Sequence, residues 1–169
     1  LHSVEAPRLY IKDDYGSDQA TQSSYYLGPN KDHYIAKNVL ELIERKRKKL
    51  DIPKNKVICA GSSKGGFAAL YFAFRGGYGY AVSGGPQIML GDYLSKGKLD
   101  GHEKDSILPP ILQYLCHEIT YENINWANNI LFNTMEESNH HPVIYLHVGQ
   151  YEPHYKNHFK HLLDFCEQS

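Results

Sequence analysis

A strand-like run, a glycine-flanked serine and an apolar helix-like run follow one another in this chain and constrain its fold more than any other stretch. Residues 57–60 form a short apolar run of the kind expected in a buried strand. The run leads into Gly-Ser-Ser-Lys-Gly at 61–65, and an apolar helix-like run at 67–74 follows at once. Strand, sharp turn and helix in this order predict an α/β unit with Ser63 on the turn.

The segment at 61–65 fits the pattern G-x-S-x-G, which places a serine on a strained turn with its hydroxyl clear of the backbone. Gly61 and Gly65 lack a Cβ, so we expect neighbouring chain to pass close to the turn. The backbone amide of Lys64 would point, with the helix N-terminus, at the oxygen of a tetrahedral intermediate. The pattern favours Ser63 as a nucleophile. The alternative is a glycine-rich turn of another doubly wound protein that binds phosphate at the helix N-terminus.

Composition excludes several classes of protein and site. The net charge of −1 over 169 residues points neither to nucleic acid nor to an acidic membrane surface. Three scattered cysteines are too few for a disulfide scaffold or a zinc motif, and they favour a reducing compartment, so we expect a cytoplasmic protein. We expect no cofactor. We also expect no membrane span, because no run approaches the roughly 18 apolar residues of a transmembrane helix.

The order of the expected elements predicts the architecture. We expect strands at 8–12, 57–60, 78–83 and 143–148, and helices at 33–50, 67–74, 107–119, 123–137 and 155–167. This alternation predicts a three-layer α/β/α domain with a mostly parallel sheet over residues 1–169. Residues 87–141 are long for a simple crossover and are expected to form a cap or a helical insertion.

Ser63 and Glu152 each follow an expected strand, so both are predicted to lie at the carboxyl ends of the sheet, where such folds place their sites. The basic run at 45–49 is interpreted as a solvated last helical turn rather than a nucleic-acid patch, because no matching basic or aromatic stripe occurs elsewhere.

Three segments give the chain a resemblance to the α/β-hydrolase superfamily: the turn at 61–65, Asp-Asp-Tyr-Gly at 13–16 and Gly-Gln-Tyr-Glu at 149–152. Gly-Ser-Ser-Lys-Gly-Gly at 61–66, Gly-Gly-Pro-Gln at 84–87 and Gly-Asp-Tyr-Leu at 91–94 look more narrowly like a bacterial branch of cell-surface glycan proteins. That branch includes the accessory Sec system O-acetyltransferase-like proteins and some capsule-biosynthesis proteins.

The resemblance implies Ser63 as the nucleophile, Glu152 as the triad acid and the Lys64 amide as an oxyanion donor. It also implies a catalytic histidine after one further strand, beyond Ser169, and three strands before Leu1. We therefore expect a hydrolase-like core truncated at both ends, and a chain that self-associates or depends on flanking sequence.

Other residues compete for these roles. His154 lies two residues past Glu152 and is the candidate base within the chain, while Asp92 is a second candidate acid. His154, His158 and His161 share one helix face at a spacing that can bind zinc, but no further ligand completes the set, so a wet helix surface is expected and no metal. The Lys64 side chain is expected to be an exposed charge at the mouth of the site.

Two functions follow. The first is a serine-dependent acyl-transfer enzyme, a carboxylic ester hydrolase or carbohydrate O-acyltransferase, acting on a small-molecule or carbohydrate ester. The alternative is a non-catalytic α/β module in surface-polysaccharide or secretion machinery.

Overall fold

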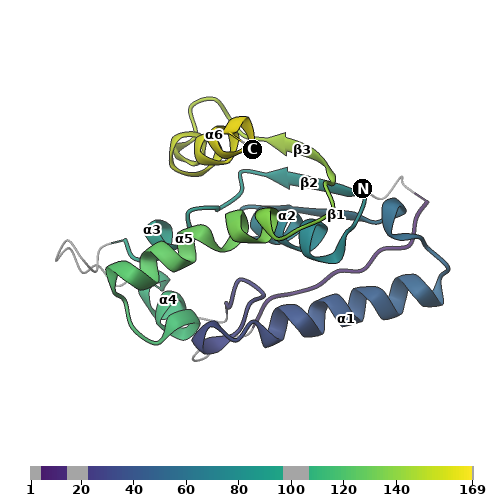
Figure 1. Ribbon diagram of the computed structural model, residues 1–169, viewed down its shortest axis with the longest axis horizontal. Helices are drawn as coiled ribbons and strands as arrows, with labels where there is room; N and C mark the ends of the chain where they lie inside the picture. Colours follow the sequence, from purple (N-terminus) through teal and green to yellow (C-terminus); the bar gives the residue numbers. More distant parts are fainter. Residues whose placement is uncertain (1–4, 15–22, 97–106, 169) are drawn as a thin grey trace.

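A parallel three-stranded sheet forms the frame of the computed structural model, which describes residues 5–14, 23–96 and 107–168 (Figure 1). The strands are β1 (Ile58–Ser62), β2 (Tyr80–Gly84) and β3 (Val143–His147). The helices are α1 (Tyr34–Lys49), α2 (Lys64–Gly76), α3 (Leu90–Leu94), α4 (Leu108–Cys116), α5 (Tyr121–Glu136) and α6 (Lys160–Gln168), the last preceded by a π-helical turn, Tyr155–Phe159.

The strands pair in the order β1-β2-β3, all parallel, and their register places Ala60, Val82 and Tyr145 side by side. Parallel neighbours need a crossover connection, because the chain has to return to the edge from which the previous strand started. Helix α2 makes this crossover between β1 and β2, and α3 to α5 make it between β2 and β3. The predicted α/β fold with a parallel sheet is confirmed.

Helix α2 is buried on nearly every side, because it lies against β1 and β2 and beside α5 (Figure 1). Phe67 and Leu70 are fully enclosed, and a helix that is apolar all round belongs in a core. Helix α1, in contrast, buries a single stripe formed by Ile35, Ala36 and Val39. The packing around α2 therefore fixes the position of the turn that precedes it.

The opposite face of the sheet is exposed. Ile58 is 61% exposed, Val82 43% and Tyr145 59%, and the register brings all three to the same side. Parallel sheets are usually covered on both faces, so apolar side chains of this size in water are uncommon. Within the described residues, the packing that holds the strands comes from the α2 side.

The predicted strand at 8–12 is wrong. Residues 5–14 pair with none of the described strands, and Leu9 and Tyr10 remain exposed while Ile11 packs against the core. A β-prone composition gives only a local preference, and a strand also needs a partner backbone at hydrogen-bonding distance. Here a cavity lies between this segment and β1 and is lined by both.

The segment at 87–141 contributes to the main core. Leu94, Leu112 and Leu131 belong to the same apolar cluster as α2, and α5 packs directly on α2. The short helix α3 was not among the expected helices. The assignment of residues 1–169 to one domain, with 87–141 as a cap or insertion, stays a prediction.

Candidate functional site

Ser63 lies on a sharp turn between the end of β1 and the start of α2. Its backbone adopts φ 55° and ψ −119°, a conformation that residues other than glycine rarely adopt and that is held only where the surroundings enforce it. The Ser63 N–H donates to the Gly84 carbonyl at 2.8 Å, which ties the turn to the end of β2. The residue is exposed. This is the geometry that the G-x-S-x-G pattern predicted.

Two glycines let α2 approach the sheet closely. A Cβ on Gly61 would lie 2.3 Å from the Gly65 carbonyl oxygen, and a Cβ on Gly66 would lie 2.9 Å from Ser83 Oγ and 3.0 Å from the Gly84 carbonyl oxygen. The expectation for Gly61 is confirmed. The expectation for Gly65 is wrong, because a Cβ there would meet nothing within 4 Å. Gly66 is instead the second tight position, where a Cβ would press on Ser83 Oγ and on the Gly84 carbonyl.

The start of α2 presents unused donors beside Ser63. Among the residues that the structure describes, the N–H groups of Lys64 and Gly65 reach no acceptor, and the helix has no side-chain cap. Such N–H groups carry the positive end of the helix dipole and favour a negatively charged oxygen. The predicted role of the Lys64 amide as an oxyanion donor fits this position.

The Lys64 side chain is not the exposed charge that the sequence suggested. Its Nζ lies 2.9 Å from Asp13 Oδ2 in an ion pair, the Asp13 side chain is fully buried, and that of Lys64 is 30% exposed. The ammonium group also donates to Ser23 Oγ at 3.2 Å and lies 5.8 Å from the centre of the Tyr26 ring. The charge is therefore used to anchor the turn.

Asp13 is the acceptor at the centre of this cluster. It accepts hydrogen bonds from the Ser24 N–H, from Ser24 Oγ at 2.8 Å and from Ser23 Oγ at 3.3 Å, in addition to the Lys64 ammonium. A buried carboxylate with this many donors is satisfied and stable. Sequence reasoning missed it. The one signal was an acidic pair at 13–14, and its partner, Lys64, lies 51 residues away.

A buried tyrosine extends the polar cluster toward the turn after β2. The Tyr25 hydroxyl donates to Gln87 Oε1 at 2.6 Å, and burial raises the pKa of Tyr25 well above its usual range, so the hydroxyl stays a donor. The Gln87 N–H in turn reaches the Ser63 carbonyl at 3.4 Å. The segment at 23–25 is thus connected to both sides of the strand–turn–helix unit at Ser63, which we call the elbow.

Glu152 lies in the loop after β3, near the ends of β2 and β3. Its Oε2 would be 3.7 Å from a Cβ on Gly85, the residue after β2, whose own N–H donates to the His147 carbonyl. The carboxylate makes no hydrogen bond or ion pair with other described residues. Ser63 and Glu152 therefore share the carboxyl end of the sheet.

His154 turns toward the start of the final helical segment. Its ring centre lies 5.4 Å from that of His158, and its Nε2 is buried with no partner in the described chain. The structure records no hydrogen bond from His154 to Ser63 or to Glu152. The catalytic roles of Ser63, Glu152 and His154 stay predictions.

His158 is a packed residue. Its Nδ1 accepts the Met89 N–H at 3.1 Å, its ring packs on Tyr93, and burial together with neighbouring cations lowers its pKa to about 4. The other candidate acid, Asp92, is exposed on α3. No set of three metal-ligating side chains is gathered in the described ranges.

Comparison with known proteins shows the fold. A chain of the Glycosylation Associate Protein (Gap123) complex from Streptococcus agalactiae matches with a TM-score of 0.72 and 18% identity, over 86% of this chain and 28% of that one. The capsule O-acetyltransferase of Neisseria meningitidis serogroup A matches with a TM-score of 0.55 and 18% identity, over 92% of this chain and 72% of that one. The chain therefore shares its α/β fold, with a parallel sheet and flanking helices, with these two structures.

Sequence comparison adds nothing to this likeness, because no family model and no curated protein matches the chain. The chain spans little more than a quarter of the Gap123 chain that it matches. At 18% identity the two structures speak for the fold and not for an activity. No helix in the described parts of the chain is long and apolar enough to cross a membrane.

The glycine contacts give a first prediction. We expect Gly61→Ala to prevent the native turn or to lower the melting temperature strongly, because the new Cβ would overlap backbone atoms of Gly65. Gly65→Ala is the matched control, since it meets open space in a helical first turn and should be neutral or stabilising by about 0.4–1 kcal/mol. Equal melting temperatures for the two variants would contradict the close approach.

The Asp13–Lys64 ion pair gives a second prediction. Lys64→Met leaves a buried carboxylate without its cation, and we expect it to lower the free energy of unfolding by about 3–5 kcal/mol. Lys56→Met, at an exposed lysine, should change it by no more than about 0.5 kcal/mol. In urea unfolding, the double variant Asp13→Asn/Lys64→Met should recover part of the loss. Strictly additive effects would show that the pair is not coupled.

His158 gives a third prediction, on how stability depends on pH. Its folded pKa of about 4 lies below the 6.5 of an unperturbed histidine, so the unfolded state takes up the proton first. Above pH 6.5, His158 is neutral in both states and does not change the free energy of unfolding. As the pH falls from 6.5 toward about 4, the free energy of unfolding decreases by up to about 1.4 kcal/mol per pH unit. We expect His158→Gln to flatten this slope in denaturant unfolding, and we expect exposed His141→Gln, which lies outside the groups that shift His158, to leave it unchanged. Equal slopes in both variants would contradict the assignment of this pH dependence to His158.

Proposed function

We propose that this protein is a serine-dependent acyl-transfer enzyme in which Ser63 is the nucleophile. The observation that carries the proposal is the backbone of Ser63, a residue with a side chain held at positive φ between a strand and a buried helix. Such strain persists only where the surroundings impose it, and it is concentrated at functional sites. Here it leaves the hydroxyl exposed beside two unused N–H donors.

The chemistry follows from that arrangement. Ser63 Oγ would form a bond to the carbonyl carbon of an ester while its proton passes to a base, and the N–H groups of Lys64 and Gly65 would donate to the resulting oxyanion. The bond to the leaving oxygen then breaks, and that oxygen takes the proton from the base. Water or a sugar hydroxyl accepts the acyl group in the reverse sequence.

His154, with Glu152 as its acid, is the base that the chain offers at this end of the sheet. To act, its ring has to leave His158 and approach the Ser63 hydroxyl. This requirement is part of the proposal, and it makes the serine's reactivity the quantity to measure.

The two structural neighbours support a carbohydrate acceptor. One is called a capsule O-acetyltransferase and the other belongs to a complex named for glycosylation. We therefore propose an O-acyltransferase or esterase acting on a carbohydrate ester, with acetyl as the acyl group to test first.

A non-catalytic module of a glycan-modifying assembly is the second candidate. It is favoured by the packing of His154 against His158, which leaves Ser63 without a base in the described residues. The Gap123 neighbour comes from a complex, which agrees with a protein that works with partners.

Reaction with a fluorophosphonate probe distinguishes the enzyme from the non-catalytic module. We expect a single adduct at Ser63 by intact mass and peptide mapping, because the probe needs an activated serine with an oxyanion site. Ser62→Ala is the matched control, since Ser62 is the exposed neighbour and its loss should not reduce labelling. Ser63→Ala should abolish both labelling and hydrolysis of an acetyl ester. Absence of labelling in the unmodified protein, or labelling that survives Ser63→Ala, would refute the enzyme proposal.

A further inference from the structure

Two adjacent tyrosines take a strained backbone beside the elbow. Tyr25 has φ 50° and Tyr26 has φ 59°, values that are rare for residues with bulky side chains. Each such residue costs about 1–3 kcal/mol and persists only where its surroundings impose the conformation, and such strain is concentrated at functional sites. Neither tyrosine takes part in the proposed chemistry, so the acyl-transfer steps alone do not explain the strain.

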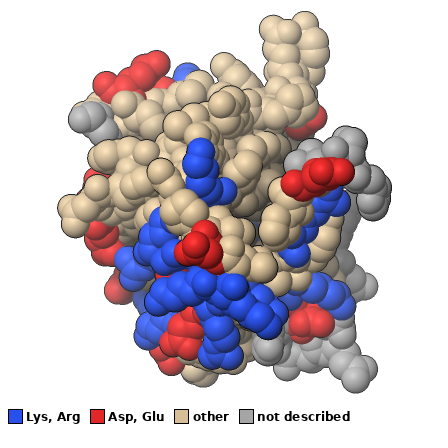
Figure 2. All heavy atoms as spheres, turned by 90° about the vertical axis from the view of Figure 1, so that its right-hand side faces the viewer, with Lys and Arg blue, Asp and Glu red and all other residues tan. Residues whose placement is uncertain are grey.

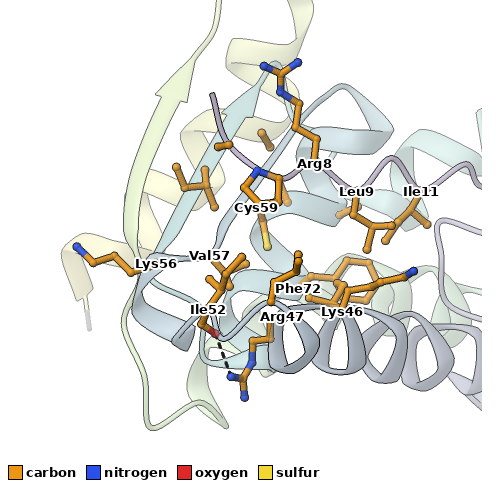
Figure 3. A pocket seen from close by; sticks show the side chains of 18 of the residues that line it. Arg8, Leu9, Ile11, Lys46, Arg47, Ile52, Lys56, Val57, Cys59 and Phe72 are labelled. Carbon is orange, nitrogen blue, oxygen red and sulfur yellow. Dashed lines mark hydrogen bonds between the residues drawn. The ribbon is translucent and has the colours of Figure 1, made fainter. Parts of the chain in front are cut away.

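The hydroxyl groups of the two tyrosines bond to different parts of the molecule. The Tyr26 hydroxyl donates to the Ile11 carbonyl at 3.2 Å, and the Tyr26 ring lies edge-on to Phe72. All three residues line the cavity between the N-terminal segment and β1, where Figure 3 labels Ile11 and Phe72. Tyr25, in contrast, is buried, and its hydroxyl donates to Gln87 Oε1 at 2.6 Å. Of the two tyrosines, Tyr25 is therefore the one that is connected to the elbow.

Gln87 and Gly84 contact the two backbone polar groups of Ser63 from outside its helix. The Gly84 carbonyl accepts the Ser63 N–H at 2.8 Å, and the Gln87 N–H donates to the Ser63 carbonyl at 3.4 Å. That carbonyl also accepts from two N–H groups of its own helix, at Gly66 and Phe67. The bond from Gln87 is at the long end of the usual range, so its strength depends on how firmly Gln87 is held.

The Tyr25 hydroxyl holds the Gln87 side chain in place. Gln87 is 5% exposed, and an O–H···O distance of 2.6 Å belongs to a short bond. Because burial raises the pKa of Tyr25, its hydroxyl keeps the proton and stays the donor. The Tyr25 ring lies edge-on to Phe67, with the ring centres 5.9 Å apart, so Tyr25 is itself packed against α2. A movement of Gln87 away from Ser63 would therefore break a buried bond and leave polar atoms without a partner.

We propose that Tyr25 and Gln87 are positioning residues for the nucleophile: the Tyr25 hydroxyl fixes Gln87, and Gln87 together with Gly84 holds the backbone of Ser63 in its strained conformation. Tyr25 does not act on a substrate directly, because it is 3% exposed and its hydroxyl is already bonded. The effect of the pair on reactivity rests on the acyl-transfer function proposed above. Its effect on the Ser63 backbone does not.

The bond between Tyr25 and Gln87 joins two uncharged groups, which separates its effect from that of the charged surface. Figure 2 shows that lysine and arginine gather over the C-terminal end of α1, whose last turn carries Lys46, Arg47, Lys48 and Lys49. Among the described residues, no hydrogen bond or ion pair links these cations to Tyr25 or Gln87. Salt screens exposed charges and acts little on a buried neutral bond. We therefore expect the effect of the pair to be the same in low and high salt.

Hydrogen exchange, followed by NMR, tests the effect on the backbone. Tyr25→Phe removes the hydroxyl alone, and we expect the amides of Ser63 and Gln87 to exchange about tenfold faster, because the buried Oε1 loses its donor. Tyr26→Phe is the matched control, since it removes the hydroxyl of the neighbouring strained tyrosine. It should leave both exchange rates unchanged. The control also corrects for a general loss of stability, because it too removes one tyrosine hydrogen bond.

Labelling of Ser63 by the fluorophosphonate probe tests the effect on reactivity. At a temperature where every variant is folded, we expect Tyr25→Phe and Gln87→Met each to lower the second-order rate constant at least about threefold, because each removes one half of the same bond. The double variant should be no slower than the single variants, since two residues that act through one bond are not additive. Tyr26→Phe should be labelled at the rate of the unmodified protein.

Two results would overturn the proposal. One is that Tyr25→Phe leaves the exchange of the Ser63 and Gln87 amides unchanged, or that Tyr26→Phe speeds it equally. The other is that the losses in labelling rate multiply in the double variant, or disappear in high salt. If the unmodified protein is not labelled, the enzyme proposal fails, and hydrogen exchange still decides whether the pair holds Ser63. If Tyr25→Phe does not fold, Gln87→Met takes its place in the exchange measurement.

Discussion

The close approach of α2 to the end of β1 is the constraint on which the elbow depends. A Cβ on Gly61 would lie 2.3 Å from the Gly65 carbonyl oxygen, which is a backbone atom, so no side-chain rotation could relieve the contact. The chain has to turn within Ser63, which takes a strained backbone at a cost of about 1–3 kcal/mol. Burial of Phe67 and Leu70 contributes about 1.5–3 kcal/mol each, which offsets that strain.

The ion pair between Asp13 and Lys64 then connects this turn to a distant part of the chain. Because the lysine follows Ser63 directly, a side chain fixed by a buried carboxylate also restricts the backbone amide beside the serine. The segment at 23–25 joins the same network through Ser23, Ser24 and Tyr25. The elbow is therefore held on one side by packing and on the other by charge.

The sequence predicted those parts of the fold that depend on residues close to one another in the chain. The strand, turn and helix around Ser63 could be inferred because apolar periodicity and glycine spacing act over a few residues. The Asp13–Lys64 pair could not, because nothing in either neighbourhood specifies a partner 51 residues away. The strand expected at 8–12 failed for the same reason, since pairing depends on where another backbone lies. His154 was a candidate base because it lies two residues past Glu152, but its packing on His158 depends on tertiary contacts.

The edge of β1 that faces away from β2 carries no strand among the described residues, and it runs directly into the turn at Ser63. Gly65, in the first turn of α2, lines the cavity, and Ser62, whose backbone points to the open edge, is bonded covalently to Ser63. On this side β1 has no neighbour in the sheet, so within the described chain β2 and α2 hold the strand in place. Since a serine at positive φ persists only where its surroundings hold it, the geometry of Ser63 depends on the packing of α2 and on the Asp13–Lys64 pair rather than on the open edge.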